Sequence, residues 1–374
     1  MQQIGIPAEI AANETRVAAT PETVKKLVAG GNSVLVQSGA GKLSAITDTA
    51  FADAGAKIVG TAQEAYNSDI ILKVRAPQAE EIGLIKEGAT VIGSFGVHTN
   101  PNLEAYAARK LDCFALEVLP RTTRAQSMDI LSSQANIAGY KAVLLATHYY
   151  PKFMPMMMTA AGTVKPARVL ILGVGVAGLQ AIATAKRLGA VVEAFDVRPS
   201  TKEQVESLGA KFVEVPMTDE EKKANDGVYA KEMSDDYKRR QGELVDKHAK
   251  AADIIITTAL IPGRPAPVLV KPETVAGMKP GSVIVDLAVE SGGNCPLSRA
   301  GEVIQTENGV TLVGSVNLPG MVAQDASALY ARNLLTFLNL MLQKDGSFKI
   351  NMEDDLVAAT RITGEGQVRY SKPN

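Results

Sequence analysis

The sequence contains no tryptophan, and aromatic residues make up only 5% of its 374 positions. So few aromatic side chains leave no stacking platform of the kind that holds single-stranded nucleic acid. Positive charge is not in excess either, because 39 lysines and arginines face 40 aspartates and glutamates. Nucleic-acid binding depends on such an excess to contact phosphates. We therefore expect no nucleic-acid partner.

Cysteine is scarce as well, with Cys113 and Cys295 as its only occurrences. They provide neither a disulfide framework nor a clustered thiol site for zinc, and His148 and His248 lack partners at metal-ligand spacing. We expect no metal site. The N-terminus lacks a basic region followed by an apolar stretch, and no segment reaches the roughly 18 uninterrupted apolar residues of a membrane span. These absences predict a cytoplasmic protein that neither enters nor crosses a membrane.

Aliphatic residues are arranged in short runs that alternate with helix-like stretches. The runs are QQIGIP, NSVLVQ, AKIVG, DIILKV, TVIGSF, DCFAL, RVLILG, VVEAFDV, KFVEV, DIIITTA, SVIVDLA and TLVGS. This alternation is typical of α/β proteins in which helices cover both faces of a parallel sheet. The chain also exceeds the length at which one core usually divides. We predict an α/β fold with two Rossmann-like domains with parallel sheets, one of them discontinuous in sequence.

The boundary between the two sets of runs is expected in a long helix within residues 134–165. After residue 316 no further strand set is expected, and the apolar-faced helix ALYARNLLTFLNLMLQ can return to the first domain. We predict an N-terminal domain of residues 1–137 plus 319–374 and a second domain of residues 138–318.

A charge-dense stretch, residues 216–252, separates two buried strands of the second domain. Connections in α/β units are usually much shorter. One interpretation is a solvated excursion that ends in an exposed helix. The other is a mobile lid over about residues 217–233, with Val228 and Tyr229 at an apolar tip beside Gly227.

The sequence ARVLILGVGVAGLQAIATAKRLGA carries the motif that points most directly to a ligand. Gly173, Gly175 and Gly178 follow a strand and open a helix, which is the context that a G-x-G-x-x-G dinucleotide site requires. The first glycine permits the tight turn, the second lets the backbone approach a pyrophosphate, and the third lets helix and strand pack closely. Val176 begins the helix whose N-terminus would face the phosphates.

Asp196 ends the next strand, 18 residues after Gly178, and we expect it to bind the cofactor together with Val197 and Arg198, which follow it. A carboxylate at this place can accept hydrogen bonds from both hydroxyls of the adenosine ribose, and it repels a 2′-phosphate. We predict a site for NAD(H) rather than NADP(H).

Several strings resemble the family of alanine dehydrogenases and proton-translocating nicotinamide nucleotide transhydrogenases. Residues 5–9 (GIPAE) and 13–21 (NETRVAATP) resemble the signature that both branches share. Residues 120–140 (PRTTRAQSMDILSSQANIAGY), 156–162 (MMMTAAG) and 257–267 (TTALIPGRPAP) resemble the transhydrogenase branch. The resemblance covers essentially the whole chain and implies the NAD(H)-binding component of that enzyme, or domain I.

The resemblance also implies further site residues. Arg121, Gln126 and Asp129 would be the catalytic-site residues, with Gln126 reaching the second nucleotide. The cofactor-binding residues would be Arg121, Thr122, Thr123, Gln126, Ser127, Met128, Asp129, Ser132, Val228, Tyr229, Gln241 and Leu260. Arginine suits a phosphate or ribose oxygen, and glutamine both donates and accepts hydrogen bonds.

By the same resemblance, hydride passes between NAD(H) on this chain and NADP(H) on a partner component, and a membrane-spanning component couples this transfer to proton movement. It implies a homodimer attached peripherally at the cytoplasmic face of the bacterial inner membrane. The chain ends at Asn374 before any membrane helix. Whether it is a separate subunit or an excised domain stays open.

Two alternatives follow from the chemistry. An NAD-dependent alanine dehydrogenase needs groups that handle protons, whereas transfer between two nicotinamides needs only distance, orientation and exclusion of water. Lys73 and Arg16 match substrate-binding residues of the alanine dehydrogenases, but their partner histidine would fall near Ser94, with His98 four residues away. The second alternative is a non-catalytic NAD(H)-sensing module.

Overall fold

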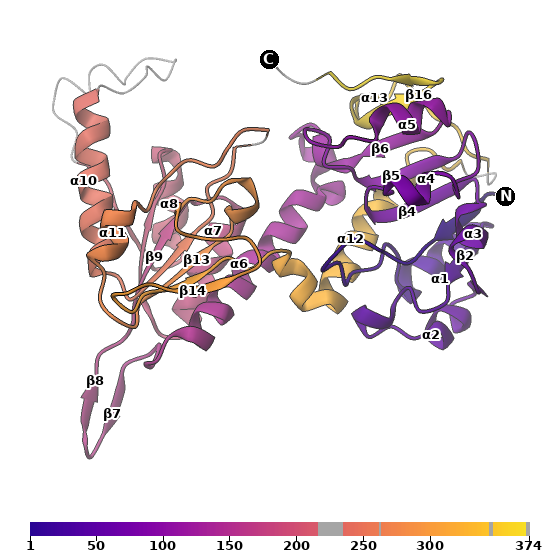
Figure 1. Ribbon diagram of the computed structural model, residues 1–374. Coiled ribbons are helices and arrows are strands. Elements are labelled where there is room, and N and C mark those ends of the chain that lie inside the picture. Colours follow the sequence, from indigo (N-terminus) through magenta and orange to yellow (C-terminus); the bar gives the residue numbers. More distant parts are fainter. Residues whose placement is uncertain (216–234, 262, 344–346, 372–374) are drawn as a thin grey trace. The chain divides into compact units, whose positions relative to one another are not determined.

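The structure is a computed structural model that describes residues 1–215, 235–261, 263–343 and 347–371. It divides into two compact units (Figure 1). The N-terminal unit comprises residues 1–135 and 319–374, and the central unit comprises residues 136–318. The boundary lies inside helix α6 (Ile130–Tyr149).

The N-terminal unit contains an eight-stranded sheet of order β17-β16-β6-β5-β4-β1-β2-β3. Its strands are β1 (Gln3–Ile6), β2 (Ser33–Gln37), β3 (Lys57–Val59), β4 (Ile70–Arg75), β5 (Thr90–Ser94), β6 (Asp112–Ala115), β16 (Arg361–Gly364) and β17 (Gln367–Val368). The six strands from β1 to β6 pair in parallel, whereas β16 and β17 extend the sheet in antiparallel fashion beside β6. The carboxyl ends of the parallel strands therefore share one edge.

Both faces of this sheet are covered by helices, because successive strand residues alternate between two apolar cores. Ile70 belongs to one core together with α1, α2 and α12, whereas Ile71 belongs to the other together with α3, α4 and α5. The helices are α1 (Pro21–Ala29), α2 (Asp48–Asp53), α3 (Ala62–Tyr66), α4 (Ala79–Ile82), α5 (Leu103–Ala108), α12 (Ala323–Leu338) and α13 (Asp355–Thr360). This arrangement places any site of the unit at a strand end rather than on a face.

The central unit contains a seven-stranded sheet of order β11-β10-β9-β12-β13-β15-β14. Its strands are β9 (Arg168–Leu172), β10 (Val191–Phe195), β11 (Lys211–Phe212), β12 (Ile254–Thr257), β13 (Val283–Asp286), β14 (Val303–Gln305) and β15 (Thr311–Val313). Its helices are α7 (Val176–Arg187), α8 (Lys202–Ser207), α10 (Asp235–Ala251) and α11 (Pro272–Ala276). Strand order reverses between β10 and β12, on either side of β9, which is where open α/β sheets bind ligands.

The predicted α/β class with two Rossmann-like sheets is confirmed, and all twelve aliphatic runs contain strands. The expectation that no strands follow residue 316 is wrong, because β16 and β17 complete the first sheet. Neither sheet is purely parallel, since β14 also pairs in antiparallel fashion. Between α6 and β9 the chain forms the hairpin of β7 (Met157–Thr159) and β8 (Gly162–Val164).

The charge-dense excursion is described only in part. Helix α10 is its second half, while the predicted lid at about 217–233, with Val228 and Tyr229, lies outside the described residues. Across the part of the chain that is described, no helix combines the length and apolar character needed to span a bilayer.

Candidate functional site

The glycine-rich turn joins β9 to α7 at the carboxyl edge of the central sheet. Gly173 has φ of 99°, a left-handed backbone that an L side chain rarely adopts. A Cβ on Gly178 would lie 2.0 Å from the carbonyl oxygen of Gly173, so only glycine permits this approach of helix to strand. Gly175 caps the helix in extended conformation, and a Cβ there would meet nothing within 4 Å. The space above the α7 N-terminus is therefore open to an anion.

Asp196 lies beside this turn, directly after β10. Its Oδ2 accepts a hydrogen bond of 2.7 Å from the backbone N–H of Val174. The other donors come from Arg198: its backbone N–H and Nε donate to Oδ1, and Nη2 donates to Oδ2, each at 2.9 Å. Burial disfavours the charged carboxylate, but the hydrogen bonds from Arg198 and Val174 outweigh it and lower the pKa of Asp196. Asp196 is therefore an ionised acceptor at neutral pH.

A cavity of about 300 Å³ lies next to Asp196. Its residues come from the ends of β10 and β11 and from α10: Phe195, Asp196, Val197, Pro199, Phe212, Val213, Glu214, Val215, Tyr237 and Gln241. Predicted residue Gln241 is thus brought to the same cavity as Asp196. Tyr237, one turn earlier on α10, also lines it and was missed, because a tyrosine within a charge-dense helix carries no motif.

The second predicted set lies at the start of α6 in the N-terminal unit. The 3₁₀ helix Thr123–Met128 presents Gln126 and Ser127 at the surface, and Arg121, Thr122 and Thr123 are exposed as well. Asp129 accepts hydrogen bonds from the backbone N–H of Ser132 at 2.9 Å and from its hydroxyl at 2.5 Å. Asp129 therefore caps α6.

Met128 differs from its neighbours, because its side chain is 4% exposed and packs in the apolar core. A role for that side chain in holding a cofactor conflicts with this position. Asn333 of α12 also holds this segment in place, because its Nδ2 donates a hydrogen bond of 2.8 Å to the carbonyl of Ser127. Core packing of Met128 and this hydrogen bond hold the exposed residues in place.

Leu260 lies on the segment after β12 and is 53% exposed. The segment is anchored by the buried side chain of Asn294. Its Oδ1 accepts from the N–H of Ala259 at 3.1 Å, and its Nδ2 donates to the carbonyls of Ala259 at 2.9 Å and Pro267 at 2.8 Å. Asn294 was missed in the sequence, since a lone asparagine after two glycines resembles an ordinary turn.

Asp286, at the end of β13, is 1% exposed and fully engaged. It accepts from the hydroxyl of Thr257 and from the backbone N–H groups of Ala288 and Cys295, at 2.9 to 3.0 Å. Its role in the structure is that of a strand-end capping carboxylate.

Lys73 and Arg16 are both closed off within the N-terminal unit. Lys73 is 1% exposed, and its Nζ lies 3.1 Å from carboxylate oxygens of both Glu9 and Glu81. Arg16 is 6% exposed and forms two 2.7 Å bonds to the carboxylate of Glu14. Because a carboxylate already faces each cation, neither is available to a substrate carboxylate as it stands.

The position at which the alanine dehydrogenases would have their histidine is near Ser94. Ser94 ends β5, and Phe95 after it is buried against Tyr106. The Nδ1 of His98 lies 2.9 Å from the hydroxyl of Tyr370 in the C-terminal segment. Among the described residues, no group of three His, Cys, Asp or Glu side chains is placed to hold a metal ion.

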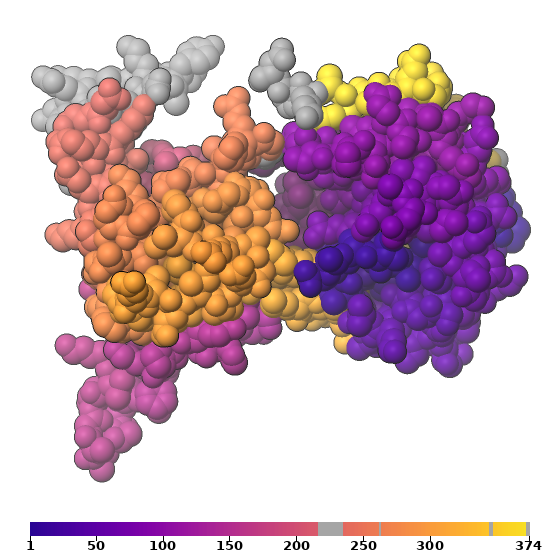
Figure 2. Space-filling view, in the orientation of Figure 1, coloured from indigo at the N-terminus to yellow at the C-terminus, as the bar shows by residue number. Residues whose placement is uncertain are grey.

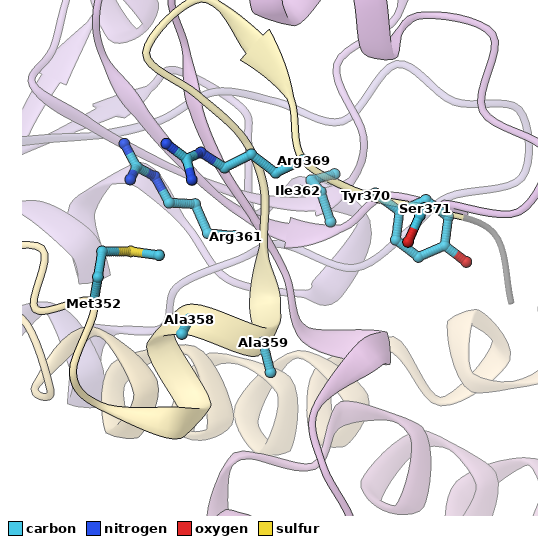
Figure 3. Close-up of a pocket in the computed structure, with 8 residues that line it drawn as sticks. All are labelled: Met352, Ala358, Ala359, Arg361, Ile362, Arg369, Tyr370 and Ser371. Atoms are coloured by element: carbon cyan, nitrogen blue, oxygen red, sulfur yellow. The ribbon is translucent and has the colours of Figure 1, made fainter.

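A second cavity, of about 360 Å³, lies near the C-terminal strands (Figure 3). Its lining is Met352, Ala358, Ala359, Arg361, Ile362, Arg369, Tyr370 and Ser371. The two guanidinium groups lie side by side, but Asp112 and Glu365 pair with Arg361, and Glu365 also pairs with Arg369. None of the predicted site residues lines this cavity.

Comparison with known proteins places this geometry in a family. The model described as Alanine dehydrogenase/PNT, N-terminal domain, matches residues 5–138, and the one described as Alanine dehydrogenase/PNT, C-terminal domain, matches residues 142–371. In Rhodospirillum rubrum, the polypeptide that forms the first part of NAD(P) transhydrogenase subunit alpha is 53% identical, with 98% of this chain and 97% of that protein covered.

Solved structures agree with this placement. A transhydrogenase from Sinorhizobium meliloti has a TM-score of 0.89 at 51% identity, covering 98% of this chain and 99% of that one. An L-alanine dehydrogenase has a TM-score of 0.80 at 25% identity, covering 98% and 97%. The chain belongs to the alanine dehydrogenase/PNT family, and within it to the group that contains the NAD(P) transhydrogenase alpha subunits.

Proposed function

We propose that this chain is the NAD(H)-binding component of a proton-translocating NAD(P) transhydrogenase. The observation that carries the proposal is a dinucleotide turn with an ionised ribose acceptor, in a chain whose candidate substrate cations are already paired. Gly173, Gly175 and Gly178 shape the turn, and Asp196 provides the acceptor. Lys73 and Arg16, which an amino-acid dehydrogenase would need, face glutamates instead.

The residues fit a dinucleotide in stereochemical terms. The open α7 N-terminus, beginning at Val176, would face the pyrophosphate, since its free N–H groups and dipole favour negative charge. The cavity next to Asp196, to which Gln241 contributes, would take the adenosine end. The bound nicotinamide would supply the hydride acceptor or donor. The protein would supply orientation and exclusion of water.

The exposed residues before α6 would serve the nicotinamide end. Arg121 provides a charged donor and Gln126 a group that both donates and accepts, and both are exposed. Asp129 and Ser132 hold each other at the helix N-terminus, which keeps this segment in one conformation. Leu260 and Tyr229 complete the proposed set. The assignment of Met128 is confined to its backbone, because its side chain lies in the core.

The proposal extends to partners. One component would carry NADP(H) and a second would span the membrane and couple hydride transfer to proton movement. This chain would form a homodimer at the cytoplasmic face of the bacterial inner membrane. Relatives named as the alpha subunit, or as the first portion of a divided alpha subunit, support the expectation of further subunits.

The test is stopped-flow absorbance of the purified chain with NADH, with and without an NADP-loaded partner component of a transhydrogenase. We expect rapid NADH oxidation only with the partner. Alanine with NAD serves as the parallel reaction. NADH formation from alanine by the chain alone would contradict the proposal and identify the chain as an alanine dehydrogenase. Tight NADH binding without hydride transfer to the partner would instead identify it as a sensing module.

A further inference from the structure

The carboxylate of Asp196 has no acceptor position left for a ligand. An ionised carboxylate offers about four lone-pair sites. Oδ1 already accepts from the backbone N–H and the Nε of Arg198, and Oδ2 accepts from Val174 N–H and from Nη2 of Arg198. Two of these four donors are backbone N–H groups, those of Val174 and Arg198. The other two belong to one side chain.

The guanidinium of Arg198 is therefore the removable part of this arrangement. Its side chain is 55% exposed, whereas that of Asp196 is 7% exposed, so the arginine covers the carboxylate from the solvent side. Its Nη2 also donates to the carbonyl of Val174 within the glycine turn, at 3.2 Å. Two N–H donors on one carboxylate match the two hydroxyls of a ribose diol in number.

We propose that Arg198 acts as a displaceable latch on the ribose site. This inference rests on the proposed function, because it takes Asp196 as the acceptor for the adenosine ribose. The guanidinium takes both positions at which the ribose hydroxyls would bind Asp196, and it must release them when a nucleotide binds. Because this ion pair must be given up on binding, it lowers the affinity for the nucleotide.

The size of the effect follows from the exposure of the pair. Partly exposed ion pairs contribute up to roughly 1 kcal/mol, which corresponds to about fivefold in affinity. Lysine at position 198 would keep the positive charge, but a single ammonium cannot hold both carboxylate oxygens as the planar fork does. Arg198→Lys should therefore bind ADP about twofold to fivefold more tightly than the unchanged protein.

The experiment compares ADP with 2′,3′-dideoxy-ADP by isothermal titration calorimetry. The matched control is Arg187→Lys, the same exchange at an exposed position near the other end of α7. The latch predicts tighter ADP binding for Arg198→Lys alone, and no gain for dideoxy-ADP, which has no hydroxyls to compete for Asp196. Thermal unfolding of each variant verifies that the fold is retained.

Two results would overturn the latch. One is ADP affinity of Arg198→Lys equal to or below that of the unchanged protein. The other is an equal gain in affinity for ADP and for dideoxy-ADP, because the gain would then not depend on the ribose hydroxyls. NADH titration of the unchanged protein is run alongside. If the unchanged protein does not bind NADH, the proposed function itself is wrong. This outcome is distinguishable from a failure of the latch alone, in which NADH still binds.

Discussion

At the scale of single residues, the glycine motif was readable because Gly173 and Gly178 each have a steric requirement that the sequence spacing already implies. The engagement of Asp196 by Arg198 was not readable, since exposed side chains choose partners by local geometry rather than by a fixed pattern. The core position of Met128 was missed for a similar reason: a 3₁₀ turn sends some of its side chains inward, and no motif marks which. The assignments of the site residues to a nucleotide remain predictions.

The glycines permit a matched pair of substitutions. Gly178→Ala would place Cβ 2.0 Å from a carbonyl oxygen, and we expect a loss of about 1 to 3 kcal/mol of unfolding free energy. Gly175→Ala meets nothing within 4 Å and has a backbone that alanine adopts, so stability should stay within about 1 kcal/mol. NADH affinity should nevertheless fall in Gly175→Ala, since the methyl group lies where the pyrophosphate would approach. Urea unfolding and NADH titration measure the two effects, and equal stability losses would contradict this account.

Glu14 gives a prediction about pH. Its burial opposes ionisation, but hydrogen bonds and charge from Arg16 outweigh this and lower its pKa to about 2. The unfolded chain therefore binds the proton first as the pH falls. This stabilisation is fully present above the unfolded pKa of about 4.5 and is lost as the pH falls towards 2, to a total of about 3 kcal/mol.

The measurement is urea unfolding between pH 6 and pH 2.5. Glu14→Gln should be less stable at neutral pH, because it leaves the buried charge of Arg16 without its partner, and its stability should decline less steeply with acid. A variant as steep as the unchanged protein would show that another carboxylate carries the acid sensitivity.

At the scale of elements, the strands that the sequence predicted are those with continuous aliphatic runs. Each of them lies inside a sheet or at an edge where it pairs in parallel with its neighbour. The strands that escaped prediction in the two main sheets are short pieces at or next to a sheet edge. Strand β16 reads Arg-Ile-Thr-Gly, in which Arg361 is buried by pairing with Asp112. No aliphatic run marks such a strand. Its place depends on β6, nearly 250 positions earlier in the chain.

Asn294 tests whether one side chain organises the segment after β12. Asn294→Ala removes three hydrogen bonds and should cost roughly 1 to 3 kcal/mol of unfolding free energy. NADH affinity should fall as well, because Leu260 lies on that segment. Asn308→Ala is the control, since its side chain also binds backbone carbonyls, those of Val275, Ala276 and Met278, away from the nucleotide turn. An equal loss of NADH affinity in both variants would show that Asn294 affects NADH binding only through the general stability of the unit.

At the scale of the whole molecule, the family was recognisable because the matching strings run through both units. Assembly was not, since an interface leaves no periodic signal. The hairpin β7–β8 stands out from the rest of the central unit (Figure 2). Met156, Met157, Met158 and Val164 are between 38% and 73% exposed there. Apolar side chains gathered on an exposed hairpin are typical of interaction surfaces.

If the hairpin contributes to the proposed homodimer, charges on it should weaken association. We expect Met157→Asp with Met158→Asp to raise the dimer dissociation constant at least about tenfold, as for central interface residues. Light scattering after size-exclusion chromatography measures this. Val303→Asp, at a 46% exposed strand position of the same unit, is the control. If the double substitution leaves the dimer dissociation constant unchanged, the hairpin is not part of the dimer interface.

The composition of the N-terminal unit from two chain segments has a consequence for synthesis on the ribosome. Its first 135 residues lack α12, whose Tyr330 donates to the carbonyls of Lys73 and Val74, and they lack strands β16 and β17, which extend the sheet beyond β6. The central unit, by contrast, is continuous from residue 136 to residue 318. At roughly 5 to 20 residues per second, its translation occupies about 10 to 40 seconds. The nascent N-terminal segment must spend that interval incomplete, so the central unit is the first that can finish folding, and a chaperone acting on this protein would meet the unfinished edge of β6.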